Sequence, residues 1–320
     1  MPVVSYRGNS VFRLWNSIKY KLVYSLFPLR WVYEWFLPKG NDVEIAFCEG
    51  YVTKLLSHAK SRSYKIAWVH TDLTNNPWPL DLGIYRNVEQ EIKSYAAFDI
   101  IVCVSKMVEN AFGEKYGLWN RLCTIYNPID VDAVRKYAGK SRCHKNDVFN
   151  IISIGRLVPQ KGYDRLLRVA KRLHDEGREY QLTILGEGQE RSSLEQYIVD
   201  NQMATYVSLP GFVKNPYEQL AHSDVFVCPS RVEGFSLVIA EAMLLGIPVI
   251  STNCSGPNEL LKNGEYGMIV ENSEEALYLG LCNFFRSPQF NSIPAQRQIE
   301  SQMCVECVMG KIDEILKYHF

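Results

Sequence analysis

The fold is decided by the stretch Val225-Phe-Val-Cys-Pro-Ser-Arg-Val-Glu-Gly-Phe-Ser-Leu-Val-Ile-Ala-Glu-Ala-Met243. Its first four residues are apolar and predict a buried strand, and the apolar residues from Ser236 onward predict a helix. Gly234, in the loop between the two, lets the backbone approach a ligand closely. The amides of Phe235, Ser236 and Leu237 fall at the positive end of the predicted helix, a natural seat for phosphate. The stretch therefore predicts a phosphate-binding loop.

Two carboxylates belong to this stretch. Glu233 lies in the loop, and Glu241 lies eight positions later among apolar neighbours of the predicted helix. A carboxylate in so apolar a helix needs a partner. The ribose hydroxyls of a nucleotide would serve, as they do for the acidic residue of dinucleotide sites. The alternative interpretation is that Glu233 caps the helix and Glu241 is a solvated surface residue.

The second half of the chain alternates apolar runs with segments of helical spacing. We expect strands near residues 150–154, 180–185, 206–209, 225–228 and 248–251, and helices near residues 164–176, 189–200, 216–222 and 237–245. Strands that are apolar throughout and alternate with helices indicate an α/β fold with a parallel sheet covered on both faces. Such a sheet binds ligands at the carboxyl ends of its strands.

The first half follows the same rhythm less completely. We expect strands near residues 43–48, 65–69, 100–104 and 123–126, and helices near residues 84–97 and 105–116. The sequence then turns polar up to Phe149, which indicates a domain boundary. The predicted organisation is a first domain over residues 1–147, a second over residues 148–300 and a final helix near residues 299–318, within a terminal segment 301–320.

A basic pair follows the predicted strand at 150–154. Arg156 and Lys161 lie within Gly155-Arg-Leu-Val-Pro-Gln-Lys-Gly162, at the sheet edge that also carries Gly234. Two cations that face a helix N-terminus can neutralise a departing diphosphate. A basic pair on a surface loop is otherwise simply solvated, so the prediction of a diphosphate site depends on both loops meeting at one edge.

Composition excludes several classes of protein. Lys and Arg total 35, as do Asp and Glu, so no net charge attracts the chain to nucleic acid. The nine dispersed cysteines indicate reduced thiols, and the redox or zinc spacing of Cys304 and Cys307 has no second pair beside it. The start lacks the pattern of a signal peptide, and no apolar run is long enough to span a bilayer. These features predict a cytoplasmic protein.

Motifs of other nucleotide and metal enzymes are absent or have a simpler interpretation. The chain contains neither a full G-x-G-x-x-G fingerprint that opens a helix nor a P-loop, so a nicotinamide dehydrogenase fits poorly. Asp130-Val-Asp132 has the D-x-D spelling of metal-dependent glycosyltransferases, but it follows an Asn-Pro turn far in sequence from the phosphate loop. We interpret it as helix capping and predict no catalytic metal and no cofactor.

Basic and aromatic residues are interleaved over residues 7–39. A helix of this composition suits the surface of an anionic bilayer, here the cytoplasmic face of the inner membrane. The alternative is an ordinary domain helix whose aromatic side chains belong to the core.

The chain resembles the GT-B glycosyltransferases of family four, the retaining group known as glycosyl transferases group 1. The matching runs are Ser153-Ile-Gly-Arg-Leu with Lys161-Gly162, Leu185-Gly-Glu-Gly188, Leu209-Pro-Gly-Phe212, the pair Glu233 and Glu241, and Gly246-Ile-Pro-Val-Ile-Ser251. Runs in the first half, which include Lys65-Ile-Ala-Trp-Val-His-Thr-Asp72 and Tyr126-Asn-Pro-Ile-Asp130, are similar to bacterial members that build capsules, exopolysaccharides and O-antigens.

The resemblance implies two Rossmann-like domains with parallel sheets that face a central cleft, and a C-terminal helix that packs back on the first domain. It implies that Arg156 and Lys161 hold the donor diphosphate and that Glu241 binds the ribose. Glu233 would lie by the donor sugar, and His70 would point toward the sugar and the acceptor. The remaining implied contacts are Val213 at the base pocket and the backbone amides of Gly234, Phe235 and Ser236.

The implied reaction is retaining transfer of a hexose or N-acetylhexosamine from a UDP-sugar to an acceptor hydroxyl, on a glycan or a lipid-linked glycan. Members of the family begin with a strand and a glycine-rich loop, whereas Val11–Tyr24 looks like a later helix, so we expect a first domain that is shortened at its start. The alternative function is a non-catalytic partner that binds a nucleotide sugar within a polysaccharide assembly complex.

Overall fold

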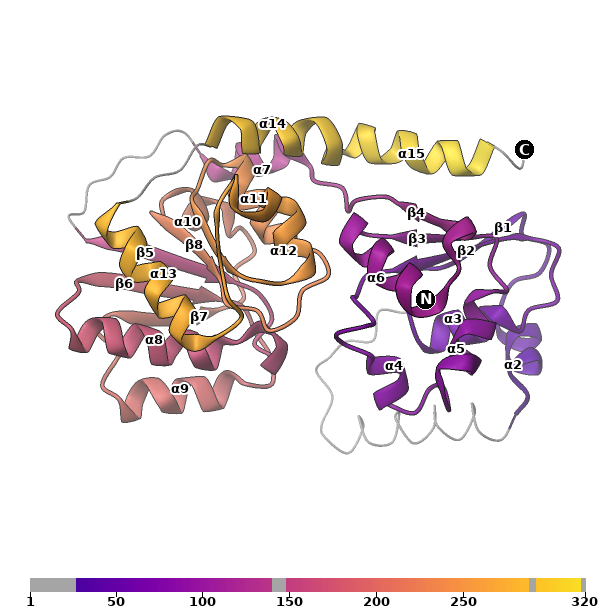
Figure 1. The fold of residues 1–320 in the computed structure, drawn as a ribbon, viewed down its shortest axis with the longest axis horizontal. Helices are drawn as coiled ribbons and strands as arrows, with labels where there is room; N and C mark the ends of the chain where they lie inside the picture. The colour runs from indigo at the N-terminus through magenta and orange to yellow at the C-terminus, as the bar shows by residue number, and fades with distance from the viewer. Residues whose placement is uncertain (1–26, 140–147, 288–291, 318–320) are drawn as a thin grey trace. The chain divides into compact units, whose positions relative to one another are not determined.

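The computed structural model describes residues 27–139, 148–287 and 292–317 (Figure 1). By contacts the chain divides into two units. The first comprises residues 1–69, 77–102 and 118–122, and the second comprises residues 70–76, 103–117 and 123–320. The predicted boundary at residue 147 ends a segment, residues 140–147, that lies outside the described residues.

The N-terminal part of the chain contains a four-stranded sheet in the order β1-β2-β3-β4, with β1 parallel to β2. Its strands are β1 (Val43–Ala46), β2 (Tyr64–Val69), β3 (Ile100–Cys103) and β4 (Leu122–Thr124), close to the predicted positions. The helices of this part are α2 (Leu29–Phe36), α3 (Tyr51–Ser57), α4 (Trp78–Asp81), α5 (Val88–Tyr95), α6 (Lys106–Tyr116) and α7 (Val131–Ala138). All six residues of β2 are buried, and the one charged residue among them, Lys65, donates from its ammonium to the carbonyl of Ala59 at 2.7 Å.

Two helix starts in this part are set by side-chain caps. The helix predicted from residue 84 begins only at Val88, because the extended Asn87 accepts a hydrogen bond from the amide of Gln90. Asp130 caps α7 by accepting from the amide of Ala133 at 2.9 Å. The interpretation of Asp130 as a helix cap is confirmed.

The second sheet has six parallel strands in the order β10-β9-β8-β5-β6-β7. They are β5 (Phe149–Ile154), β6 (Tyr180–Leu185), β7 (Val207–Gly211), β8 (Val225–Cys228), β9 (Val249–Thr252) and β10 (Met268–Val270). The helices between and after them are α8 (Tyr163–Asp175), α9 (Arg191–Asp200), α10 (Tyr217–Ala221), α11 (Leu237–Leu244), α12 (Ser255–Leu260) and α13 (Glu274–Arg286). The parallel α/β prediction for this half is confirmed.

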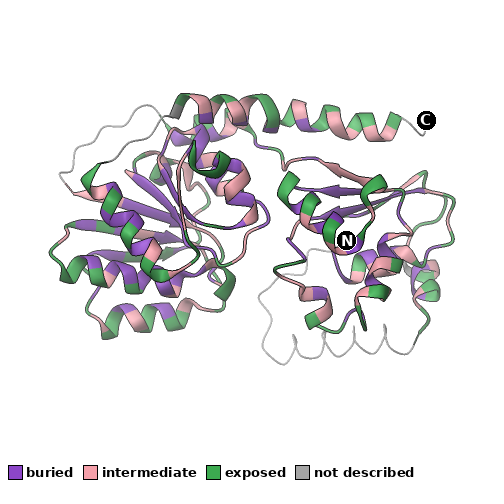
Figure 2. Cartoon of the chain, in the orientation of Figure 1, coloured by how far each residue is buried: buried purple, intermediate pink, exposed green. Residues whose placement is uncertain are grey.

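Burial follows the predicted pattern. The strands at the centre of the six-stranded sheet are mostly buried, while α8 and α9 each keep one exposed side (Figure 2). β8 and β9 are buried at every residue. The strand order reverses at β5, which has β6 on one side and β8 on the other. A ligand of an open parallel sheet binds at such a switch point, so the loops that follow β5 and β8 are the expected site.

The C-terminal region corrects two expectations. A single helix over residues 299–318 is wrong, because α14 (Ser292–Met303) and α15 (Val305–Lys317) are separated at Cys304. The helix is interrupted there because Cys304 forms a β-bridge with Ile129, whose amide donates to the carbonyl of Met303 at 2.8 Å. Cys304 and Cys307 form a disulfide, so the expectation of reduced thiols fails for this pair. The other six described cysteines are free thiols.

Helix α2 is the described part of the basic and aromatic segment. Val32 and Tyr33 are buried, whereas Trp31 and Trp35 are half or more exposed, at 50% and 61%. The segment thus contributes to the core and also keeps aromatic surface, while residues 7–26 lie outside the described residues. Within the described ranges, no helix is both long and apolar enough to cross a bilayer.

Candidate active site

A cavity of about 360 Å³ lies at the switch point of the six-stranded sheet. The ends of β5 and β8, together with the loops that follow them, supply most of its walls. It therefore brings together six of the residues predicted from the sequence: Arg156, Lys161, Glu233, Phe235, Ser236 and Leu237. Asn127 and Ser153, which sequence analysis did not predict as site residues, also line it.

Lys161 and Glu233 form an ion pair within this cavity. Lys161 ends a short 3-10 turn (Pro159–Lys161), and the Ser230 hydroxyl is a second donor to Glu233, at 3.4 Å. Burial lowers the pKa of Lys161, but the charge of Glu233 and its hydrogen bond outweigh burial and raise that pKa above its ordinary value. The pocket therefore holds a charged ammonium at its wall.

The structure tests the interpretation of Glu233 as a helix cap. The residue that caps α11 is Ser236, whose hydroxyl accepts from the amide of Ile239 at 3.4 Å. The Glu233 carboxylate instead pairs with Lys161, whose position is 72 residues earlier in the chain. The capping alternative is therefore wrong for Glu233, whose carboxylate lines the cavity in an ion pair with Lys161.

Glu241 has the partner that its apolar surroundings demand. It lies on α11 and accepts a hydrogen bond from the Tyr217 hydroxyl of α10 at 3.1 Å. Burial raises the pKa of Glu241 to about 7, although the hydrogen bond from Tyr217 opposes that shift. Tyr217 was not predicted, because nothing in the local sequence shows that α10 and α11 are neighbours. Glu241 does not line the cavity itself.

The other predicted residues lie around the two loops. Gly234 is tightly packed, since a Cβ at this position would come within 2.4 Å of the carbonyl oxygen of His70, a residue of the same unit. His70 follows β2, and Val213 lies in the loop between β7 and α10. Neither His70 nor Val213 is among the residues that line the described cavity. Their predicted contacts stay predictions.

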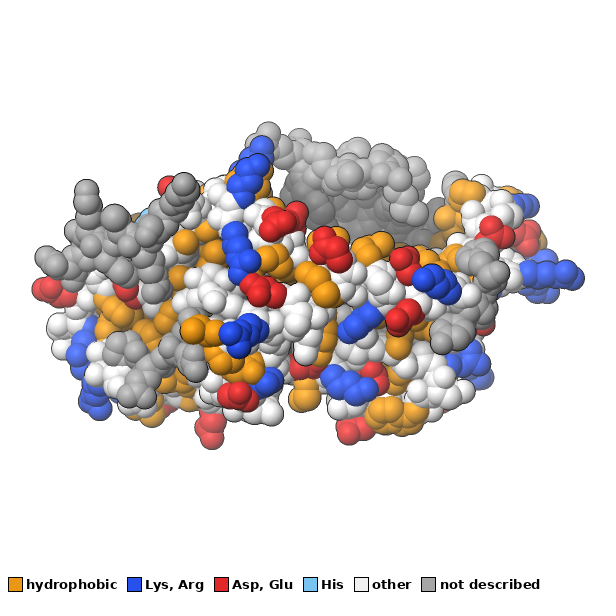
Figure 3. Space-filling view, turned by 90° about the horizontal axis from the view of Figure 1, so that it is seen from above, with side chains coloured by type: hydrophobic (Ala, Val, Ile, Leu, Met, Phe, Trp, Pro, Cys, Tyr) orange, Lys and Arg blue, Asp and Glu red, His pale blue; other side chains and the backbone are white. Residues whose placement is uncertain are grey.

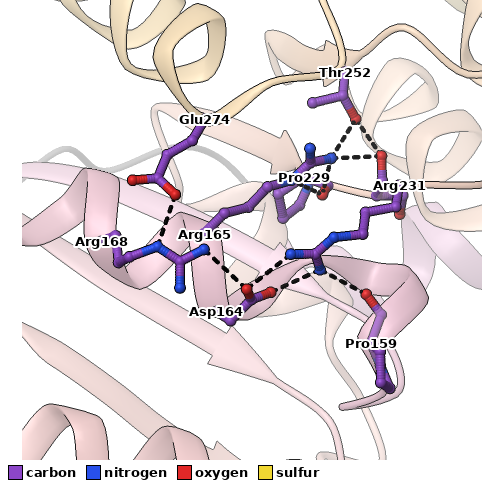
Figure 4. Close-up of polar contacts among 9 residues, drawn as sticks. Pro159, Asp164, Arg165, Arg168, Pro229, Arg231, Thr252 and Glu274 are labelled. Carbon is purple, nitrogen blue, oxygen red and sulfur yellow. Dashed lines mark hydrogen bonds and ion pairs between the residues drawn. The ribbon is translucent and has the colours of Figure 1, made fainter.

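A network of polar contacts ties the two loops together (Figure 4). Arg231, two residues before Glu233, forms a bidentate pair with Asp164 of α8 at 2.7 and 2.8 Å. It also donates from its guanidinium to the carbonyl of Pro159 at 2.7 Å, and from its amide to the carbonyl of Gln160. The Arg231 hydrogen bonds hold the pKa of Asp164 well below its usual range. The loop with Glu233 is thus fastened to the turn with Lys161.

Comparison with known proteins identifies this half of the chain. Residues 140–296 match the family model described as Glycosyl transferases group 1. This part is a group 1 glycosyltransferase domain. The cavity, the ion pair and the capped helix α11 all lie within it or beside it.

Relatives extend the similarity beyond this domain. The chain is 29% identical over 259 residues to an uncharacterized glycosyltransferase of Methanocaldococcus jannaschii, covering 79% of this chain and 53% of the relative. It is 33% identical over 190 residues to the N-acetylgalactosamine-N,N'-diacetylbacillosaminyl-diphospho-undecaprenol 4-alpha-N-acetylgalactosaminyltransferase of Campylobacter jejuni, covering 58% of this chain and 51% of that enzyme. The chain spans about half the length of such relatives.

A solved structure shares the fold. The crystal structure of the Anabaena protein HepE in complex with UDP matches with a TM-score of 0.75 and 20% sequence identity. The match covers 93% of this chain and 82% of that protein. The fold is the GT-B type predicted from the sequence, with two parallel-sheet α/β parts.

We also searched the described residues for side chains that could bind a metal ion. They contain no group of three or more His, Cys, Asp or Glu side chains that could hold a metal ion. Asp130, the first residue of the D-x-D spelling, is engaged as a helix cap next to the glycosyltransferase domain. The absence of a catalytic metal stays a prediction.

Proposed function

We propose that the protein is a metal-independent glycosyltransferase that transfers a hexose or N-acetylhexosamine from a UDP-sugar to an acceptor hydroxyl with retention of configuration. The observation that carries this proposal is the cavity at the switch point, where Arg156, Lys161 and the amide end of α11 meet beside Glu233. Cations and helix amides together suit a diphosphate, and a carboxylate next to them suits a sugar that becomes cationic.

The residues divide the reaction between them. The bond between the anomeric carbon and the diphosphate oxygen breaks, and its electron pair leaves with UDP. Arg156, Lys161 and the amides of α11 neutralise that leaving group, which is where most of the rate enhancement arises. The acceptor oxygen forms the new bond to the anomeric carbon, and its proton passes to the anionic oxygen of the departing UDP. Glu233, 11% exposed at its side chain, stabilises the sugar as positive charge develops.

The remaining predicted residues contact the nucleoside and the sugar. Glu241 binds the ribose hydroxyls, Val213 lines the base pocket and His70 positions the sugar or the acceptor. The solved HepE structure contains UDP, which supports a uridine donor here. The Campylobacter jejuni relative is named for an undecaprenol-linked acceptor, which supports a lipid-linked glycan in surface polysaccharide synthesis.

If the acceptor is lipid-linked, the transfer reaction takes place at the cytoplasmic face of a membrane. The exposed Trp31 and Trp35 of α2 supply aromatic surface suited to a bilayer interface. Basic and acidic side chains are interspersed on the face that Figure 3 shows, and no single-sign patch there suits nucleic acid. We therefore propose peripheral contact with the membrane through residues 7–39 and no nucleic-acid partner.

The test is UDP release from a panel of UDP-hexoses and UDP-N-acetylhexosamines, with purified full-length protein. We expect one donor to be hydrolysed slowly and to react faster when membrane lipid extract supplies an acceptor. The protein with Lys161→Met is the blank for contaminating hydrolases. UDP binding without release from any donor would favour the non-catalytic binding partner, and no UDP binding at all would overturn the proposal.

The Tyr217 hydroxyl gives a second prediction. In Tyr217→Phe, Glu241 loses its hydrogen-bond donor, so its pKa should rise further above about 7. A hydrogen bond worth about 1 kcal/mol shifts a pKa by about 0.7, which leaves about threefold less ionised Glu241 at pH 7. We expect UDP affinity, measured by calorimetry, to fall about threefold at pH 7 and to recover at pH 9. An equal loss at both pH values would contradict a role through ionisation.

A further inference from the structure

Arg165 differs from the other arginines of α8. Arg168 and Arg172 are exposed and pair with carboxylates, Arg168 with Asp164 and Glu274. Arg165 is only 5% exposed and forms no ion pair in the described part of the chain. A buried charge without a carboxylate partner is costly unless its hydrogen bonds are well satisfied. What those bonds hold is therefore informative.

The Arg165 guanidinium binds the backbone where the loop after β8 begins (Figure 4). Its Nε and Nη2 donate to the carbonyl of Pro229 at 2.9 and 2.6 Å, and Nη2 donates to the carbonyl of Ser230 at 2.8 Å. The Thr252 hydroxyl at the end of β9 also donates to the Ser230 carbonyl, at 2.5 Å. Two consecutive carbonyls are thus fixed just before Arg231 and Glu233.

Gly162 brings the other loop against the same carbonyl. Its φ is +69°, and a Cβ there would come within 2.1 Å of the Pro229 oxygen and 2.9 Å of Arg165 Nε. Gly162 directly follows Lys161, so the turn with the ammonium contacts the carbonyl that Arg165 holds. The position of Lys161 relative to Glu233 therefore depends on the hydrogen bonds of Arg165 to the Pro229 and Ser230 carbonyls. It also depends on residue 162 being a glycine, which has no Cβ.

We infer that Arg165 is a positioning residue for the donor diphosphate, and this inference rests on the proposed function. It acts through the carbonyls of Pro229 and Ser230, which set where Glu233 and the α11 amides lie relative to Lys161. Its side chain does not line the cavity. A planar guanidinium can span two carbonyls, whereas a lysine ammonium at the same position cannot reproduce that fork.

The test compares binding of UDP with binding of uridine. The predicted uridine contacts, Val213 and Glu241, lie outside the loop that Arg165 holds. In Arg165→Lys we expect UDP affinity to fall about tenfold and transfer kcat to fall about 10²-fold, the effect of a displacement near 1 Å. Uridine affinity should stay within about twofold, because the change is confined to the diphosphate end of the site. Lys171→Met on the same helix removes a cation from a surface pair with Asp175 and should change neither ligand.

Gly162→Ala provides a second route to the same displacement. The added methyl would come within 2.1 Å of the Pro229 oxygen and 2.9 Å of Arg165 Nε, so it displaces the same carbonyl and should also lower UDP affinity more than uridine affinity. This variant decides the matter if Arg165→Lys does not fold. Equal losses of UDP and uridine affinity would reduce Arg165 to a structural role and overturn the inference, as would unchanged UDP affinity. Failure of the wild-type protein to bind UDP would instead overturn the proposed function.

Discussion

Lys161→Met is expected to lower sugar transfer about 10³-fold, the upper end of the loss seen when one preorganised charge-stabilising group is removed. Lys161 is the better placed of the two cations, because its ammonium is partly buried and held at the cavity wall, whereas Arg156 is exposed. A group that is already oriented stabilises a developing charge without reorganisation. The loss should appear mainly in kcat, since the negative charge on the leaving group grows in the transition state.

The measurement is the initial rate of UDP release from the donor identified in the panel. Lys171→Met is the matched control, because it removes the same charge from an exposed position of α8 and should leave the rate unchanged. Arg156→Met should have a smaller effect than Lys161→Met. Transfer by Lys161→Met within tenfold of the wild-type rate would show that the ammonium is not the principal stabiliser of the leaving group.

Glu241→Gln is expected to stabilise the protein at pH 8 in the absence of UDP and to weaken UDP binding. Burial raises the pKa of Glu241 from its ordinary value of 4.5 to about 7. Between those two pH values the folded protein holds a proton that the unfolded chain has lost, so wild-type stability falls as the pH rises through this window. Above pH 7 the wild-type protein has lost about 3 kcal/mol of folding stability in this way. Glutamine has no charge to desolvate and avoids that cost.

Thermal unfolding of wild type and Glu241→Gln at several pH values tests whether wild-type stability falls as the pH rises. The two should melt together near pH 4.5 and diverge as the pH rises, with the variant the more stable at pH 8. UDP affinity of the variant should fall about tenfold or more, since a charged acceptor is replaced by a neutral one. Glu218→Gln on the exposed side of α10 is the control and should show neither effect. A variant less stable than wild type at pH 8 would contradict the burial of an ionisable carboxylate.

Local pattern was enough to predict five of the six strands of the second sheet and the two loops of the site, whereas the short strand β10 was not predicted. β8 is apolar at every position because both of its faces are covered, and α8 repeats its apolar residues at helical spacing. The loops after β5 and β8 follow directly from these elements, since parallel strands bring their carboxyl ends to one edge. Arg156, Lys161 and Glu233 were therefore placed correctly together at the cavity.

What sequence did not reveal depends on contacts between distant segments. The pairing of Lys161 with Glu233 and of Tyr217 with Glu241 joins residues whose neighbours in the chain give no sign of each other. Arg165 was overlooked because a charged residue in an amphipathic helix is ordinarily solvated. Its spacing of four residues from Val169 places it on the buried side and was the available signal. The break at Cys304 likewise arises from a bridge to Ile129.

The ion pair between Lys161 and Glu233 means that the cavity carries its own counter-ion. An incoming phosphate oxygen must compete with the Glu233 carboxylate for the Lys161 ammonium, so net affinity reflects an exchange of one anion for another. In the proposed reaction the same exchange would release the carboxylate as the diphosphate binds. In the proposed reaction Glu233 would act on the sugar only once the leaving group is bound, and a small neutral sugar that enters alone would meet a carboxylate that is paired with Lys161.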